Sequence, residues 1–276
     1  MKSQFIKFLI VFILVVGCAK QQSKAEHTSE PSNETSFSKN KIVDLTHEFS
    51  EETIYWVTAK EFEMEVVFKG ETDNGFYYTA NNFATAEHGG THIDAPIHFS
   101  KNKQTVDEIP LEKLIGPAIK IDVSKKAVLD RDYLISIEDF TNWETQEGTK
   151  IPNGSIIVLE TGYSQFYPDK IKYLGTDQRG DEAVKLLHFP GLSPEAAEWL
   201  INNRNIHAIG IDTPSIDYGQ SQLFKTHVNL MSENIPAFEN LTNLDKLPNK
   251  GFYIVALPMK IKGGSGAPLR IIAFLN

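Results

Sequence analysis

Short apolar runs separated by turn residues dominate the chain beyond residue 40. Many of these runs are rich in β-branched residues, and runs of this length and composition predict β-strands. In the run at 61–69 apolar and polar positions partly alternate, so we expect that strand to be half-buried. The expected strands are 42–45, 61–69, 77–83, 118–123, 155–160, 206–211, 252–257 and 269–275, with a glycine-rich turn at 263–266 between the last two.

One segment has the pattern of a helix instead, residues 193–202. Ser193 is suited to the N-cap position, Pro194 to the first helical position, and Glu195 to the first turn. A helix among many short strands favours an α/β-like fold.

The first seventeen residues have a different pattern. Lys2 and Lys7 bracket the start of an apolar run that is shorter than the roughly 20 residues needed to span a bilayer. A basic start followed by a short apolar stretch is typical of a secretory signal. The run ends in Val15-Val16-Gly17-Cys18, which resembles a bacterial lipobox. This resemblance implies cleavage before Cys18 and its lipidation; the alternative is an uncleaved N-terminal anchor.

Residues 19–40 are polar, with Phe37 as the only large apolar side chain. Such a segment cannot bury enough surface to offset its ordering entropy, so we expect a flexible tether. The predicted organisation is a lipoprotein signal peptide (1–17), a lipidated cysteine with its tether (18–40), and one domain (41–276). We expect a lipid-anchored protein of the bacterial cell envelope, facing the periplasm or the surface. Ala19, in place of the aspartate that retains lipoproteins in the inner membrane, favours an outer membrane.

Composition and charge narrow the function classes. The 276 residues are 41% hydrophobic, enough for a sizeable core. The chain has 27 basic and 36 acidic side chains, and its net charge of -9 argues against nucleic acid as a partner, because binding phosphates requires an excess of Lys and Arg. Its one cysteine, Cys18, cannot form an internal disulfide or a four-cysteine zinc site.

A histidine cluster carries the clearest chemical signal. Residues 88–98 read His-Gly-Gly-Thr-His-Ile-Asp-Ala-Pro-Ile-His, a spacing of H-x3-H-x-D-x3-H. Its glycines and proline disfavour a helix, so we expect a loop or strand-turn. His88, His92 and Asp94 supply two imidazoles and one carboxylate, which suit Zn(II), Mn(II) or Fe(II) and leave a position open for water. The alternative is a loop that binds no metal, in which these histidines form hydrogen bonds to the backbone.

This segment resembles the H-x-G-T-H-x-D-x-P-x-H signature of the cyclase family of metal-dependent hydrolases. The family includes bacterial kynurenine formamidases (arylformamidases) and isatin hydrolases. Later segments at 210–217, 227–241 and 257–270 are similar to the family's remaining motifs and occur in the same order. The resemblance therefore covers residues 41–276.

The resemblance implies a swivelling β/β/α, cyclase-like single domain with mixed sheets, assembled as a homodimer or homotetramer. It implies one or two divalent ions, Zn(II) first and Mn(II) as the alternative. It also implies roles for individual residues: His88, His92 and Asp94 bind the first ion, His227 joins a second, Glu239 bridges both with Asp94, and His98 is the acid/base. Asp212 and Asp217 are candidates to hold ligand histidines by hydrogen bonds.

The expected chemistry is hydrolysis by activated water. A bound divalent ion lowers the pKa of its water from 15.7 to about 7, and a histidine can return a proton to the leaving nitrogen. His98 is the natural candidate for that proton transfer. No cysteine lies near the cluster, and Gly162-Tyr163-Ser164 lacks the closing glycine of a nucleophile elbow.

Tyr55 and Trp56 are expected to line a pocket for an aromatic small-molecule amide or imide. We expect cleavage of a C–N amide bond of the arylformamide (N-formylkynurenine) kind, a step of tryptophan catabolism. One alternative is a cyclic amide or imide hydrolase of the isatin kind. The other is a non-catalytic metal- or ligand-binding lipoprotein at the surface, which would have no need of His98 or of an open coordination position.

Overall fold

The computed structural model describes residues 41–275. The predicted signal peptide, the lipidation site Cys18 and the tether at 18–40 lie outside the described residues. No helix in the described part is both long and apolar enough to cross a membrane.

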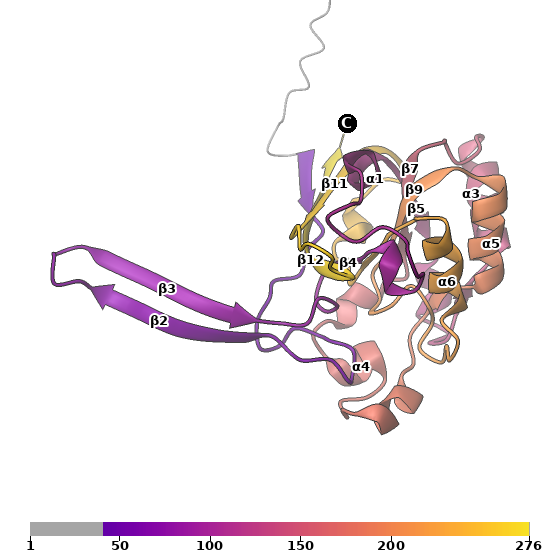
Figure 1. Cartoon of the computed structure of the whole chain (residues 1–276). Coiled ribbons are helices and arrows are strands. Elements are labelled where there is room, and N and C mark those ends of the chain that lie inside the picture. Colours follow the sequence, from indigo (N-terminus) through magenta and orange to yellow (C-terminus); the bar gives the residue numbers. More distant parts are fainter. Residues whose placement is uncertain (1–40, 276) are drawn as a thin grey trace, which may run out of the picture. The chain divides into compact units, whose positions relative to one another are not determined.

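Seven strands close into a barrel-like mixed sheet, as Figure 1 shows. Their order is β12, β11, β5, β7, β9, β10 and β4, and β4 pairs back onto β12. The run from β5 to β10 is parallel and the other pairings are antiparallel. An eighth strand, β1, pairs with the far part of β12. The strands are β1 (Ile42–Asp44), β4 (His92–Asp94), β5 (Ile115–Asp122), β7 (Ser155–Glu160), β9 (Ile206–Ile211), β10 (Ala237–Glu239), β11 (Lys250–Pro258) and β12 (Gly266–Leu275).

Helices cover the outer side of the parallel strands. In β7, Ile156 and Val158 point into the barrel, while Ile157 and Leu159 face the helices. Burial on both faces explains why this strand is a continuous apolar run in the sequence. The helices of this layer are α3 (Ile137–Glu147), α5 (Pro194–Asn203) and α6 (Lys225–Ser232).

The predicted helix is confirmed as α5. The Ser193 side chain accepts a hydrogen bond from the backbone N–H of Ala196 at 3.0 Å, and Pro194 occupies the first turn. Shorter elements complete the fold: α1 (Leu111–Leu114), α2 (Ser124–Ala127), α4 (Lys170–Leu174), the 3-10 helices η2 (Pro96–His98), η3 (Tyr163–Phe166), η4 (Asp181–Leu186) and η5 (Leu244–Lys246), and the paired strands β6 (Leu134–Ile135) and β8 (Gly191–Leu192).

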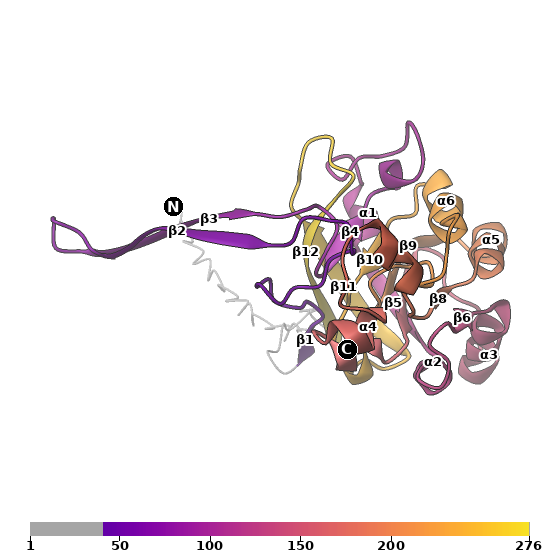
Figure 2. The ribbon, with the colours of Figure 1, turned by 90° about the horizontal axis from the view of Figure 1, so that it is seen from below.

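A long hairpin corrects one prediction. Strands β2 (Glu63–Glu71) and β3 (Tyr77–Ala84) form a separate two-stranded antiparallel sheet with a bulge between Val66 and Phe68. The hairpin extends away from the barrel in Figures 1 and 2. The strand at 61–69 exists, but the expectation that it is half-buried was wrong, because nearly all of β2 is exposed. Alternation indicates a strand, whereas burial requires a packing layer, and the described chain supplies none here.

Candidate metal centre

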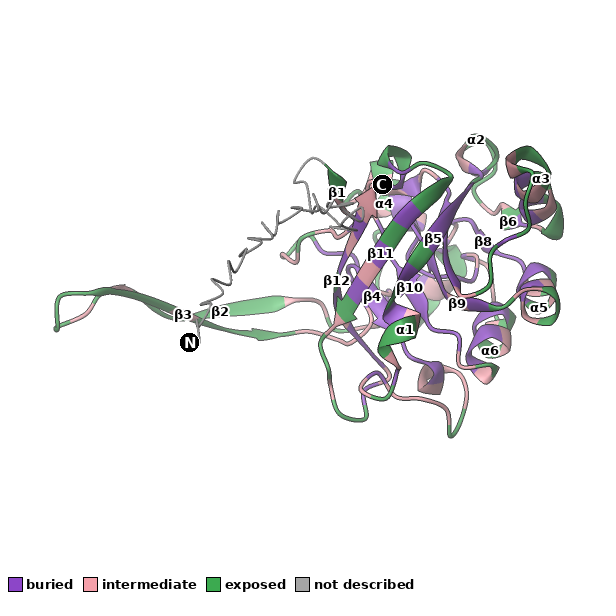
Figure 3. Ribbon diagram, turned by 90° about the horizontal axis from the view of Figure 1, so that it is seen from above, coloured by how far each residue is buried: buried purple, intermediate pink, exposed green. Residues whose placement is uncertain are grey.

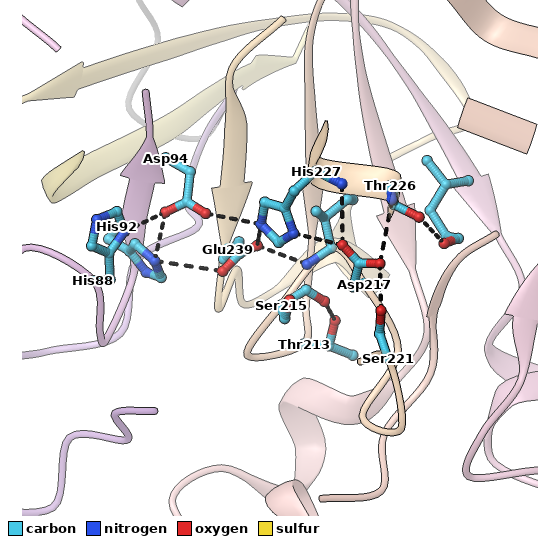
Figure 4. Close-up of polar contacts among 12 residues, drawn as sticks. His88, His92, Asp94, Thr213, Ser215, Asp217, Ser221, Thr226, His227 and Glu239 are labelled. Carbon is cyan, nitrogen blue, oxygen red and sulfur yellow. Dashed lines mark hydrogen bonds and ion pairs between the residues drawn. The ribbon is translucent and has the colours of Figure 1, made fainter. Parts of the chain in front are cut away.

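Three strands bring the predicted ligands together at one end of the barrel. In the antiparallel pairing of β4 with β10, His92 lies opposite Glu239. On its other edge β4 pairs with β12, where Asp94 lies opposite Gly266. Helix α6 supplies His227 above this junction. Residues more than 130 positions apart in the sequence therefore converge on one buried point (Figure 4).

Asp94 is the centre of the cluster. One of its carboxylate oxygens lies 2.6 Å from Nδ1 of His88 and 3.1 Å from Nε2 of His92. The other oxygen lies 3.0 Å from Nε2 of His227. Asp94, His92 and His227 are each at most 3% exposed. One carboxylate therefore faces three imidazole nitrogens, as Figure 4 shows.

Glu239 supplies a second carboxylate to the same point. Its oxygens lie 3.2 Å from Nε2 of His227 and 3.5 Å from Nε2 of His92. The Glu239 oxygen that faces His227 also accepts a 2.7 Å hydrogen bond from the backbone N–H of Ile216. His92, Asp94 and Glu239 each offer a donor atom, and those atoms lie within 4.8 Å of one another.

Neighbouring groups hold the outer nitrogen of each histidine ring. Nδ1 of His92 lies 2.9 Å from the carbonyl oxygen of Gly90. Nδ1 of His227 lies 2.6 Å from the carboxylate of Asp217. In both rings the outward N–H at Nδ1 orients Nε2 toward the carboxylates, where it would bind a cation. Burial lowers the pKa of both imidazoles, but the hydrogen bonds and charges of the carboxylates outweigh it and raise that pKa. Asp217 thus holds a candidate ligand.

His88 is held by a longer chain of hydrogen bonds. Its Nε2 lies 2.8 Å from the hydroxyl oxygen of Ser265, and this hydroxyl donates a 2.7 Å hydrogen bond to Glu87. The backbone N–H of Ser265 donates to the same carboxylate at 2.9 Å. Glu87 and Ser265 therefore orient His88 so that Nδ1 faces Asp94.

The electrostatics of the cluster fit a divalent cation. Burial raises the pKa of Asp94, but the charges and hydrogen bonds of the neighbouring histidines outweigh it and hold that pKa well below the usual range. Burial and the nearby negative charge of Asp94 raise the pKa of Glu239. Two buried carboxylates repel each other unless a positive charge lies between them. With three imidazole nitrogens facing them, this donor set suits zinc or manganese.

His98 lies beside the cluster and carries no hydrogen bond on its ring among the described contacts. The ring stacks on His88 with the centroids 3.8 Å apart. Burial lowers the pKa of His98 to about 4. One donor atom each from His98, His88 and Asp94 lie within 4.8 Å of one another, so geometry alone permits both proton transfer and metal binding by His98.

A cavity of about 280 Å³ opens onto the cluster. Tyr55 and Trp56 line it, where the sequence interpretation expected them. Phe99 and Phe224, which that interpretation missed, also form its walls, and both rings approach His227. No lysine or arginine lines the cavity in the described part of the chain.

Two glycines of the motifs are required by close packing. A Cβ atom on Gly89 would lie 2.0 Å from the ring of Tyr55, and one on Gly266 would lie 2.5 Å from the ring of His88. Gly89 therefore lets Tyr55 form the cavity wall. Gly266 leaves room for the His88 ring.

Two further sequence interpretations change in the structure. Asp212 does not contact a ligand histidine; its carboxylate accepts hydrogen bonds from Thr161 and from the backbone of Gly162. Ser265, read only as part of a turn, contacts His88 directly. The only sequence signal for Ser265 was its place within the last motif of the resemblance.

Comparison with known proteins gives consistent matches. The family model named Cyclase matches residues 43–218. The chain is 30% identical to an isatin hydrolase of Roseibium aggregatum over 85% of its length and 86% of the relative. It is 26% identical to a kynurenine formamidase of Salinibacter ruber, over 84% and 96% of the two chains. The solved isatin hydrolase A from Ralstonia solanacearum superposes with a TM-score of 0.76 at 33% identity, covering 85% of this chain and 92% of that one.

Proposed function

Because the chain belongs to the cyclase family of metal-dependent hydrolases, we propose that it opens a neutral cyclic amide of the isatin type. The observation that carries the substrate class is the cavity wall, which is aromatic and has no lysine or arginine among its described residues. A flat neutral ring system gains from stacking there and needs no ionic partner.

The metal is held, in this proposal, by the cluster around Asp94. Asp94 and Glu239 lie between the histidines and serve as bridging carboxylates if two ions bind, with zinc first and manganese as the alternative. A divalent ion there supplies a nucleophile at neutral pH, because it lowers the pKa of bound water to about 7. The assigned ligands are His88, His92, Asp94, His227 and Glu239.

The protein's own groups complete the reaction. Trp56, Phe99 and Phe224 hold the ring system and exclude water from its faces. Cleavage of the C–N bond leaves a nitrogen that must gain a proton. His98 lines the same cavity, and its lowered pKa keeps the imidazole neutral at pH 7. In this proposal its unprotonated nitrogen takes a proton from water and passes it to the leaving nitrogen.

An arylformamide of the N-formylkynurenine kind is the second candidate substrate. The likeness to the Salinibacter ruber kynurenine formamidase supports it. N-formylkynurenine carries an α-ammonium group and an α-carboxylate, however, and the described cavity wall offers no cationic side chain to pair with the carboxylate. We therefore rank a simple uncharged arylformamide above N-formylkynurenine itself.

A substrate panel with metal removal tests the proposal. The full chain is loaded with Zn(II) or Mn(II) and assayed on isatin, formanilide and N-formylkynurenine, with and without chelator. We expect kcat/KM for isatin to exceed that for N-formylkynurenine by at least about tenfold, because the carboxylate of N-formylkynurenine would find no cationic partner in the cavity. Chelator should abolish turnover and added metal should restore it.

Two results would contradict the proposal. Turnover that persists in the presence of chelator would show that the reaction does not require the metal. Tight metal binding without turnover of any amide, imide or ester would favour the non-catalytic binding protein instead.

We propose a location in the bacterial cell envelope through a lipid on Cys18, with the outer membrane favoured. The support is the sequence of residues 5–19. We expect metabolic labelling with a fatty acid to mark the wild-type chain and not Cys18→Ser, and the variant to leave the membrane fraction, since several acyl chains are needed for stable anchoring. Equal fatty-acid labelling of the wild type and of Cys18→Ser would contradict lipid attachment at Cys18.

A further inference from the structure

The pairing of strands β4 and β10 ends beside the metal centre. The last pair in its register joins His92 to Glu239. Both strands are buried along their whole length, as Figure 3 shows. The next residue, Asn240, has a φ of 53°, which lies in the left-handed region and ends the extended conformation of β10. The buried backbone groups beyond this pair therefore need other hydrogen-bond partners.

Two side chains supply these hydrogen bonds in place of the strand ladder. The amide nitrogen of the Asn240 side chain donates a 2.8 Å hydrogen bond to the carbonyl oxygen of Gly90. In the opposite direction, the hydroxyl of Thr91 donates a 2.7 Å hydrogen bond to the backbone carbonyl oxygen of Asn240. These two reciprocal hydrogen bonds, here called the clamp, join the segment before His92 to the residue after Glu239.

The carbonyl group of Gly90 links the clamp to a proposed metal ligand. Nδ1 of His92 lies 2.9 Å from the same oxygen that accepts the amide of Asn240. A carbonyl oxygen has two lone pairs, so it can accept the imidazole N–H and the amide N–H together. Nε2 of His92 lies 3.1 Å from the carboxylate of Asp94, on the inner side of the ring. A displaced Gly90 carbonyl would therefore turn this ring away from the cluster.

A buried tyrosine fixes the orientation of the Asn240 amide. The hydroxyl oxygen of Tyr173 lies 2.9 Å from Oδ1 of Asn240 and 3.1 Å from the backbone carbonyl oxygen of Asp212. Burial raises the pKa of Tyr173 well above its usual range, so the hydroxyl keeps its proton and acts as a donor. Because Oδ1 accepts from this hydroxyl, the amide nitrogen of Asn240 is the atom that faces Gly90.

We propose that Asn240 is a positioning residue of the metal centre. Through the Gly90 carbonyl it orients His92, and through the clamp it fixes the separation of His92 from Glu239. Asn240 lines the cavity, but it is only 2% exposed, and its backbone N–H donates to Thr213 at 2.9 Å, so all four of its polar atoms have partners within the protein. This inference rests on the proposed metal centre and is independent of which amide is the substrate.

Asn240→Gly tests this role by the metal affinity of the purified full chain. Glycine adopts a positive φ without strain, so the variant removes the amide and keeps the backbone conformation accessible. Affinity for Zn(II), measured by competition with a chromophoric chelator, should fall about 10- to 100-fold. The visible absorption of Co(II) bound in place of Zn(II) should also change, because its bands depend on the geometry of the ligands.

Two further variants separate positioning from a general loss of stability. Tyr173→Phe should lower Zn(II) affinity by a smaller factor and add little to the loss in Asn240→Gly, because its hydroxyl acts through Asn240. Asn243→Gly is the matched control. Asn243 also has a positive φ, of 58°, and its amide donates to the Asp44 carbonyl oxygen at 2.8 Å, but it lies outside the cavity. This control should keep the wild-type Zn(II) affinity and Co(II) spectrum even where its Tm falls.

The outcomes distinguish this inference from the proposed function. A wild-type chain that binds no Zn(II) would overturn the proposed metal centre and the role of Asn240 together. If the wild type binds Zn(II), unchanged affinity and an unchanged Co(II) spectrum in Asn240→Gly, or unchanged affinity in Tyr173→Phe, would overturn the positioning role alone. An equal loss of affinity in Asn243→Gly would do the same, because it would reveal a general effect of stability.

Discussion

Asp94→Asn is expected to lower hydrolysis by at least about 10³-fold and to empty the metal centre. The carboxylate faces Nδ1 of His88, Nε2 of His92 and Nε2 of His227, so it contacts all three rings. Asparagine keeps the shape but has no charge to offset a divalent cation and offers a single oxygen ligand. Metal content of the purified variant and kcat/KM for the preferred amide give the two readouts.

Two further variants calibrate this result. Asp177→Asn, an exposed aspartate outside the cavity, should change neither readout. Ser265→Ala leaves every proposed ligand in place but removes the hydroxyl that holds His88, so metal affinity should fall by an intermediate factor of about 10 to 100. If Asp94→Asn retained its metal and its activity, the centre assigned here would be wrong.

His98→Ala is expected to lower kcat by about 10²- to 10⁴-fold, the range of general acid–base catalysis, while the metal stays bound. Burial lowers the pKa of this imidazole to about 4, so at pH 7 the ring is neutral and has an unprotonated nitrogen, but it is a weaker base than a free histidine. It lines the cavity but makes no described side-chain hydrogen bond, which leaves both nitrogens available to substrate and water.

Metal analysis separates proton transfer by His98 from a role as a ligand, because donor atoms of His98, His88 and Asp94 lie close enough to share one ion, within 4.8 Å of one another. Unchanged metal content with lost turnover, partly restored by added imidazole, supports proton transfer. Loss of metal from His98→Ala, without loss from His188→Ala, would instead make His98 a ligand. His188 pairs with Asp132 at the surface and serves as the matched histidine control.

Local patterns were sufficient for most strands and for α5. The runs at 155–160 and 206–211 coincide with β7 and β9, because strands buried on both faces are nearly continuous apolar runs. Helix α3 was not predicted, although a capping box joins Ser136 to Asp139 at its start. Phe140 and Trp143 are the two large apolar residues of α3 that are buried. Its hydrophobic stripe is therefore too short to be recognised as a helix pattern in the sequence.

The sequence by itself determined the chemistry of the first three candidate ligands. His88, His92 and Asp94 lie within seven residues, so the chain keeps them near one another whatever the tertiary structure. Tertiary structure alone decided which distant groups join them. Strand register sets Glu239 opposite His92, and β12 brings Ser265 to His88 across 177 positions. It also decided that the alternating strand at 63–71 faces solvent. Pairing and burial depend on what packs against a segment, and no local pattern contains that information.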